Sequence, residues 1–172
     1  MAFGVLALMV ASLFTGAAIH VNFVEHPARS VLDPGAQLEA WKPSYARSAA
    51  MRASLAVVGF ALGMAAWWQT RDDRWLGGAL LLVASWPFTL IMLAPTNKVL
   101  RALYPGQATL ESRALLERWG HLHAIRTVLG VAATALDFGG WNELDWRAAV
   151  FSALGSLALV GLMRMISMRT NH

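Results

Sequence analysis

Long stretches without charge are the feature that most limits what this chain can fold into. No Asp, Glu, Lys or Arg occurs in residues 1–24, 53–70, 75–97 or 148–163. A helix rises 1.5 Å per residue, so about 20 apolar residues cross the roughly 30 Å hydrocarbon core of a bilayer. Hydrophobic residues make up 57% of the chain and charged residues only 14%, which is more apolar than soluble domains are. The sequence therefore predicts a multi-pass membrane protein.

Three spans follow directly from these runs, at about residues 3–24, 49–69 and 75–95. The fourth is less obvious, because only ten residues separate Arg126 from Asp137. A span over residues 119–136 is long enough, but it must carry Arg126 inside it. An ionisable group at such a depth is costly and is usually functional.

A shorter uncharged run at residues 148–163 predicts a fifth span. The predicted fold class is thus all-α, an integral membrane helical bundle with four core transmembrane helices plus a C-terminal fifth. We expect residues 1–136 to form the four-helix domain. Residues 137–172 are expected to form an outer loop, the fifth transmembrane helix and a cytoplasmic tail.

Basic residues predict the orientation of the bundle. Eight Lys and Arg residues follow spans 1 and 3, whereas three lie in the opposite loops. Positive loops stay in the cytoplasm, so we expect the N-terminus outside and the polar motifs on the cytoplasmic side of a bacterial inner membrane. A net charge of +4 then reflects topology, and no nucleic-acid partner is expected.

Two prolines are expected to disturb the spans. Pro27 disfavours helical backbone at the residue before it, so the first helix should break at His26. Pro87 lies within the third span, removes a backbone donor and predicts a kink there.

Polar residues gather near the inner ends of the spans. Asn22, Glu25, His26 and Arg29 are spaced to share one face of the first span, and Trp119, His123, Arg126 and Thr127 do so on the fourth. Tyr45 and Arg52 start the second span, and Asn97 ends the third. This convergence predicts a site at the inner end of the bundle. The structural alternative is a tie between Arg126 and Glu25 or Glu117.

A metal site remains an open alternative. The chain has no Cys, so thiolate ligands are excluded. His26, His123 and Glu25 could together hold a single Fe, Cu or Mn ion, because mixed imidazole and carboxylate ligation suits these metals. His121 and His123 point in different directions on a helix and cannot share an ion. We therefore expect either no cofactor or one such ion.

Five short motifs occur in an order that resembles one family. They are Glu25-His26-Pro27-Ala28-Arg29, Trp41-Lys42-Pro43-Ser44-Tyr45-Ala46-Arg47, Trp86-Pro87-Phe88-Thr89, Pro95-Thr96-Asn97 and Trp119-Gly120-His121-Leu122-His123-Ala124-Ile125-Arg126-Thr127. Together they resemble the anthrone-oxygenase-like family of small integral membrane proteins over about residues 4–136. Bacterial members of that family were long catalogued as a domain of unknown function.

The resemblance implies a four-helix membrane bundle and, in characterised members, oxygenation of an anthrone to an anthraquinone without flavin or haem. The positions that recur in the family correspond here to His26, Pro27, Arg29, Asn97, Trp119, His123 and Arg126. From these and the polar stripes we expect catalytic roles for His123, Arg126, His26 and Asn97. Substrate-binding roles are expected for Arg29, Trp119, Trp86, Tyr45 and Arg52.

The resulting hypothesis is a membrane-embedded monooxygenase that acts on a small apolar, aromatic substrate. Its expected partners are the lipid bilayer, that substrate and O2. The alternative is a non-catalytic membrane protein that binds or transports an apolar ligand, or an accessory subunit of a membrane complex. The sequence leaves the substrate and the oligomeric state open.

Overall fold

The computed structural model describes residues 2–142, and every regular element within them is a helix. The predicted all-α helical bundle is confirmed for this part of the chain. The fifth span expected at residues 148–163 lies outside the described residues. The elements are α1 (Ala2–His20), η1 (Val21–Glu25), α2 (His26–Ser30), α3 (Pro34–Thr70), α4 (Asp73–Phe88), η2 (Thr89–Leu93), α5 (Ala94–Ala102), η3 (Pro105–Gln107) and α6 (Leu110–Asn142).

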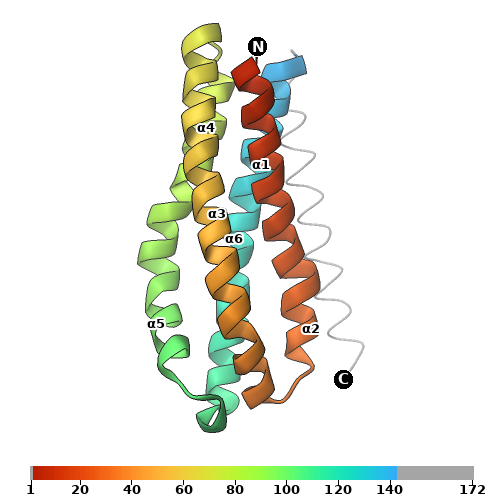
Figure 1. Cartoon of the computed structure of the whole chain (residues 1–172), viewed down its shortest axis with the longest axis vertical. Helices are drawn as coiled ribbons and strands as arrows, with labels where there is room; N and C mark the ends of the chain where they lie inside the picture. Colours follow the sequence, from red (N-terminus) through yellow and green to blue (C-terminus); the bar gives the residue numbers. More distant parts are fainter. Residues whose placement is uncertain (1, 143–172) are drawn as a thin grey trace.

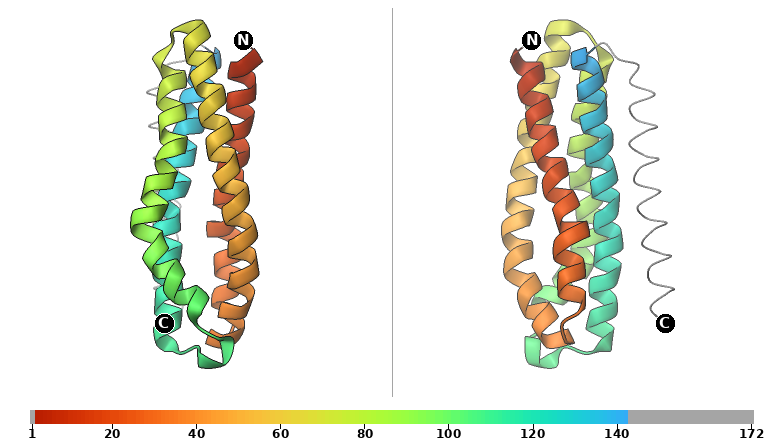
Figure 2. Two further views of the ribbon diagram at one scale, coloured as in Figure 1. Left: turned by 60° about the vertical axis from the view of Figure 1, so that its left-hand side comes forward. Right: turned by 90° about the vertical axis from the view of Figure 1, so that its right-hand side faces the viewer.

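Four long rods form the bundle (Figures 1 and 2). The rod α1–η1–α2 runs away from the N-terminus, α3 returns, α4–η2–α5 runs away again and α6 returns. The first and third rods each pack against both α3 and α6, so antiparallel neighbours stand at the corners of a square. We call the end with the N-terminus and the α3–α4 turn the amino end. The opposite end, with the α2–α3 and α5–α6 connections, is the loop end.

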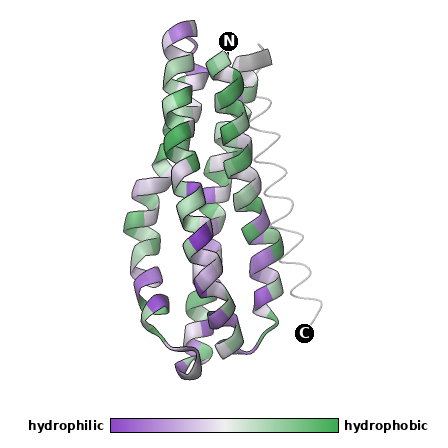
Figure 3. Ribbon diagram, in the orientation of Figure 1, coloured by the Kyte–Doolittle hydropathy of each residue, from purple (hydrophilic) through white to green (hydrophobic). Residues whose placement is uncertain are grey.

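Three of these rods are long and apolar enough to cross a membrane, namely Ala2–Ser30, Pro34–Thr70 and Asp73–Ala102. Large apolar side chains such as Leu13, Leu90 and Ile91 are exposed on the outside of the bundle. Figure 3 shows apolar residues along the amino half and more polar residues toward the loop end. The chain is therefore a membrane protein.

The fourth rod, α6, completes the bundle and is as long as the others, but it is less apolar. It holds Arg126 in its middle, as the sequence predicts. The expected domain boundary at residue 136 lies inside α6, which continues to Asn142. Asp137, expected in an outer loop, is 1% exposed.

The second rod starts well before the expected span at residues 49–69. The Asp33 side chain accepts hydrogen bonds from the backbone N–H groups of Gly35 and Ala36, both at 3.0 Å. Pro34 occupies the first helical position, where its missing N–H costs nothing. This cap starts α3 fifteen residues before the membrane segment and places Trp41 and Tyr45 on a helix.

The expected break at His26 is wrong. His26 keeps helical backbone angles (φ −65°, ψ −47°), and its N–H bonds to the carbonyl of Val21, five residues earlier. The π-helical turn η1 thus ends at Glu25, two residues before Pro27. In a regular α-helix the proline ring collides with the carbonyl group four residues earlier. A π-helical turn moves that carbonyl aside, so the helix continues through Pro27 without a break.

Pro95 repeats this arrangement on the third rod. The N–H of Ala94 bonds to the carbonyl of Thr89, five residues earlier, and closes the π-helical turn η2. Below this turn the rod bows away from the bundle before α5 leads back (Figure 2, left). Pro87, where the sequence predicts a kink, lies in α4 two residues before η2. Thr89 donates its hydroxyl to the Ser85 carbonyl at 2.6 Å.

Candidate functional site

The π-helical turn η1 brings Asn22 into the interior of the loop half, where it is 4% exposed. Its amide nitrogen donates to the Gly120 carbonyl at 3.1 Å. Its amide oxygen accepts a hydrogen bond from the Thr127 hydroxyl at 2.7 Å and faces His123 Nδ1 at 2.8 Å. Asn22 therefore joins the first rod to three successive turns of α6.

This contact fixes the tautomer of His123. A carbonyl oxygen only accepts, so the Asn22 nitrogen faces Gly120 and the Asn22 oxygen faces the imidazole. Nδ1 must then carry the hydrogen, and in the neutral ring the lone pair lies on Nε2. His123 is fully buried, and its Nε2 has no hydrogen-bond partner among the described residues. A base or a ligand needs such a nitrogen.

An aromatic cluster surrounds this histidine. The Trp119 ring lies 5.1 Å from the His123 ring and 6.3 Å from the His26 ring, between centroids. Trp41 meets Trp119 edge-on at 5.7 Å, and Tyr45 stacks on Trp41 at 4.7 Å. Trp41 and Trp119 are both buried, so the cluster keeps water away from the imidazole.

His26 also lies against α6, at a point where only glycine fits. A Cβ on Gly120 would lie 2.4 Å from His26 Nε2. His26 Nε2 is 3.4 Å from the Glu117 carboxylate, which is 45% exposed. His26 therefore connects the aromatic cluster to an accessible carboxylate.

Arg29 and Glu25 form a pair of their own. Arg29 donates to the Glu25 carboxylate at 3.2 Å and to the Ser44 hydroxyl at 2.7 Å, and Ser44 donates to the same carboxylate at 2.9 Å. These bonds tie the first rod to α3. Arg29, expected to bind substrate, has a structural partner instead and does not line the cavity described below.

Two further arginines are buried with no carboxylate in contact among residues 2–142. Arg52 is 0% exposed and donates from Nη2 to the Ser48 hydroxyl at 3.1 Å, while its Nε and Nη1 have no partner among residues 2–142. Arg126 is 6% exposed, and its Nε likewise has none. The expected tie from Arg126 to Glu25 or Glu117 is absent, because these carboxylates face Arg29 and His26.

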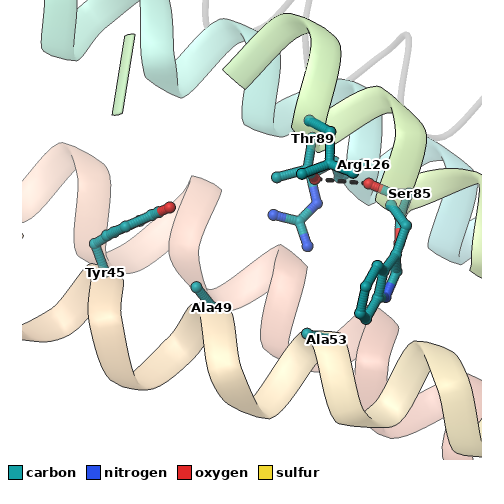
Figure 4. A pocket seen from close by; sticks show the side chains of 8 residues that line it. Tyr45, Ala49, Ala53, Ser85, Thr89 and Arg126 are labelled. Carbon is teal, nitrogen blue, oxygen red and sulfur yellow. Dashed lines mark hydrogen bonds between the residues drawn. The ribbon is translucent and has the colours of Figure 1, made fainter. Parts of the chain in front are cut away.

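A cavity of about 190 Å³ opens between α3, the third rod and Arg126 (Figure 4). It is lined by Tyr45, Ala49, Ala53, Ser85, Trp86, Thr89, Leu90 and Arg126. The Arg126 guanidinium reaches from α6 toward α3, with the Tyr45 hydroxyl on the other side of the space. An apolar hollow with a few polar groups is the usual form of a small-molecule site.

A wider hollow of about 510 Å³ shares Tyr45, Thr89 and Leu90 with this cavity. It extends toward the loop end and is bordered by Asn97, Lys98 and Arg101. Asn97 is 5% exposed, and its side-chain oxygen has no partner in the part of the chain that the structure describes.

The structure thus divides the expected site residues into three groups. Arg126, Tyr45 and Trp86 line the cavity, and Asn97 lines the adjoining hollow. The second group, His123, Trp119 and His26, forms the aromatic cluster. The third group consists of Arg29, which is paired with Glu25, and Arg52, which is fully buried.

Asn22, Thr127 and Glu117 belong to the site, although they were not among the expected site residues. Asn22 and Thr127 did lie on the two polar stripes, and an amide inside an apolar run was the signal that could have identified their role. The spacing of residues along the sequence could not predict the contact between Glu117 and His26. This contact depends on how α6 is rotated against the first rod.

The described residues do not fit the metal site considered above. No group of three or more His, Asp or Glu side chains within residues 2–142 is placed to hold an ion. Of the three expected ligands, His123 keeps Nε2 available, but His26 faces Glu117 and Glu25 is bound to Arg29 and Ser44.

The fold and the cavity define a multi-pass helical membrane protein with a largely apolar cavity between its helices. Comparison with known proteins places it further, because the family model of anthrone oxygenases matches residues 41–136, more than half of the chain. The chain belongs to the anthrone oxygenase family.

A curated relative is similar to part of this chain. It is the anthrone oxygenase tpcL of Aspergillus fumigatus, 38% identical over 61 residues. The match covers 34% of this chain and 38% of that protein, so the chain spans well under half of the relative's length. No solved structure matches.

Proposed function

We propose that this protein is a membrane-embedded oxygenase that acts on a small apolar aromatic substrate with an acidic C–H group. One observation carries the proposal: a buried histidine with a fixed tautomer and an available Nε2 lies one helical turn from an arginine that faces an apolar cavity. Family membership supports the reaction class.

In the first step, His123 acts as the base. Asn22 holds the hydrogen on Nδ1, so Nε2 takes the proton from the acidic C–H next to a carbonyl group. The negative charge moves to the carbonyl oxygen of the substrate, where the Arg126 guanidinium stabilises it in a medium of low dielectric constant. Tyr45, Trp86 and Asn97 serve to hold the substrate in the cavity and the adjoining hollow.

In the second step, the carbanion carbon reacts with O2, which dissolves well in the same apolar medium. A C–O bond forms and the proton held by His123 completes a hydroperoxide. Loss of water from this hydroperoxide gives the new carbonyl group. A CH2 group and one O2 thus become a C=O group and one H2O, and O2 is the oxidant. His26 and Glu117 connect the aromatic cluster to solvent and serve as a second proton-bearing pair.

Oxygen uptake by the purified protein in lipid nanodiscs tests this proposal. With the parent anthrone we expect uptake of one O2 per anthraquinone formed, and His123→Gln should reduce the rate by a factor of about 10² to 10⁴, the usual contribution of a general base. His121→Gln is the matched control, since His121 is exposed on the same helix. No uptake above the uncatalysed rate would favour the binding or transport alternative.

We also propose that the loop end faces the cytoplasm of a bacterial inner membrane. Two of the eight basic residues on that side, Arg29 and Arg52, are buried, but the remaining six still outnumber the three opposite. The chain has no Cys, so a single cysteine reports its own position. Gly106→Cys in η3 should react with an impermeant maleimide only after cell lysis, and Gln69→Cys at the amino end should react in intact cells. The reverse pattern would overturn this orientation.

A further inference from the structure

Arg52 takes no part in the reaction described above. It is the most deeply buried charged side chain of the loop half. Its side chain is 0% exposed and two of its donor nitrogens, Nε and Nη1, have no partner among the described residues. It lies within electrostatic range of Arg126. An arginine does not lose its proton to relieve such a situation. Both guanidinium groups therefore stay charged in the interior.

The surrounding groups do not balance these two charges. The first rod offers Glu25, His26 and Arg29. Glu25 attracts Arg52 from a distance, but its carboxylate is bound by Arg29 and Ser44. α6 offers Glu117, which faces His26. The third rod contributes Ser85 and Thr89 to the cavity but no acidic group, and its loop-end charges are Lys98 and Arg101. Within residues 2–142, no carboxylate lies within 4 Å of either Arg52 or Arg126.

Two unbalanced cations inside a bundle that crosses a membrane are costly, because both lose their hydration there. An enolate formed during the reaction would neutralise one of the two positive charges, but only while it exists. Before the reaction begins, both charges would remain unbalanced. A ligand that already carries a negative charge removes this cost for as long as it is bound. Arg126 lines the cavity and supplies the matching hydrogen bonds, while the enclosed Arg52 adds the attraction of its charge.

We infer that the cavity binds its ligand as an anion: an aromatic molecule with an ionised acidic group, a carboxylate or an acidic phenol, held by Arg126 and attracted in addition by the charge of the enclosed Arg52. Ala49, Ala53 and Leu90 line the rest of the space, which suits a flat apolar body and excludes a strongly hydrated inorganic ion. The aromatic body of the ligand rests on the proposed function. The preference for a negative charge rests on the two arginines alone.

Equilibrium binding without turnover tests this inference. The probes are 2-naphthoate and 2-naphthamide, which have the same shape and differ in charge. They are titrated anaerobically into the protein in phosphatidylcholine nanodiscs, with calorimetry as the readout. We expect 2-naphthoate to bind at least about tenfold more tightly, since hydrogen bonds to a charged acceptor are roughly twice as strong as neutral ones. Equal affinities in the wild type would overturn the inference without any variant.

Variants identify the responsible charge. Arg52→Gln and Arg126→Gln should each remove most of the preference, and Arg52→Lys should keep part of it. Arg47→Gln is the control, because Arg47 is exposed on the same helix as Arg52 and its loss should change nothing. An equal effect of Arg47→Gln would assign the preference to the surface potential and overturn the inference.

A lipid headgroup is the other possible source of a negative charge. Nanodiscs with phosphatidylglycerol should leave 2-naphthoate binding unchanged, and strong competition would show that the site serves lipid and overturn the aromatic ligand. The binding assay is also separate from oxygen uptake. Absent uptake with a preserved preference for 2-naphthoate contradicts the proposed function alone, whereas uptake without the preference contradicts only the inference made here.

Discussion

The two halves of the bundle are built from the same four rods but are held together differently. In the amino half the rods approach closely through small residues: a Cβ on Gly63 would lie 2.9 Å from the Ala79 Cβ, and one on Gly59 would lie 2.6 Å from Leu82. In the loop half two π-helical turns and several buried polar side chains occupy the space between the rods. The cavity lies in this second region.

This difference indicates how a small membrane protein can combine stability with a polar site. Helices in lipid gain stability from close packing, for which small residues are needed. Buried charges reduce stability, so they are tolerated where another part of the bundle holds the rods together. We therefore expect variants of the amino half to lower stability and variants of the loop half to change the chemistry.

The largest expected effect is a loss of turnover rate without a loss of stability. Arg126→Gln removes the group that stabilises the developing oxyanion, so the turnover rate should fall about 10² to 10³-fold. The apparent melting temperature should stay equal or rise, because an unpaired buried cation disappears. Oxygen uptake and thermal unfolding in nanodiscs measure the two effects. Arg118→Gln, an exposed position two turns earlier on α6, is the control, and a variant that fails to fold would show that Arg126 is structural.

A substitution in the amino half should lower stability without changing the site. Gly63→Ala places a Cβ 2.9 Å from that of Ala79 and 3.2 Å from the Trp75 carbonyl oxygen, and overpacking of this kind costs about 1–3 kcal/mol. The same change at Gly16, where nothing lies within 4 Å, should stabilise the protein slightly because alanine favours a helix. Thermal unfolding of both variants tests the contrast. It is refuted if the two shifts have the same sign.

A matched pair of threonines sharpens the comparison further. Thr127→Val removes one hydrogen bond to Asn22, and Thr134→Val removes the 2.9 Å contact with the Thr15 hydroxyl in the amino half. Each should cost about 1 kcal/mol of stability, the usual net value of such a bond. Only Thr127→Val should also lower the turnover rate, since Asn22 orients His123. Equal rates in both variants would argue against a role for Asn22 in catalysis.

The smallest expected effect concerns the α3–α4 turn at the amino end. Arg74 donates to both Asp72 carboxylate oxygens, and this hydrogen bonding holds the pKa of the Asp72 carboxyl below its ordinary value. The ionised side chain also caps α4 at the N–H of Arg74. Its charge therefore contributes stability above the unfolded-state pKa of about 3.9, and this contribution disappears as the pH falls through the lower folded-state pKa.

Asp72→Ser keeps a cap without the charge and tests this dependence. The wild type should melt at the higher temperature between pH 5 and pH 7, by less than the equivalent of about 1 kcal/mol. The difference should vanish in acid. A difference that is independent of pH would assign the whole effect to the cap.

Much of the fold could be predicted from the sequence, for a simple reason. Burying charge in lipid is so costly that the uncharged runs mark the three rods that are long and apolar enough to cross a membrane. The fourth rod has no such run, and the charges of the loops set the expected topology. The stripe from Trp119 to Thr127 likewise identified the polar face of α6, because helical periodicity fixes which residues share a face.

The tertiary structure decided the partners of these residues and the path of the helix through Pro27. The expected break at His26 was wrong, because a π-helical turn relieves the clash that the proline creates in an α-helix. Glu25 and Glu117 could each have paired with Arg126. The rotation of the rods placed them against Arg29 and His26, so that no carboxylate of residues 2–142 contacts Arg126 or Arg52. Spacing along one helix states which side chains share a face, but the approach of separate helices sets the distances between charges.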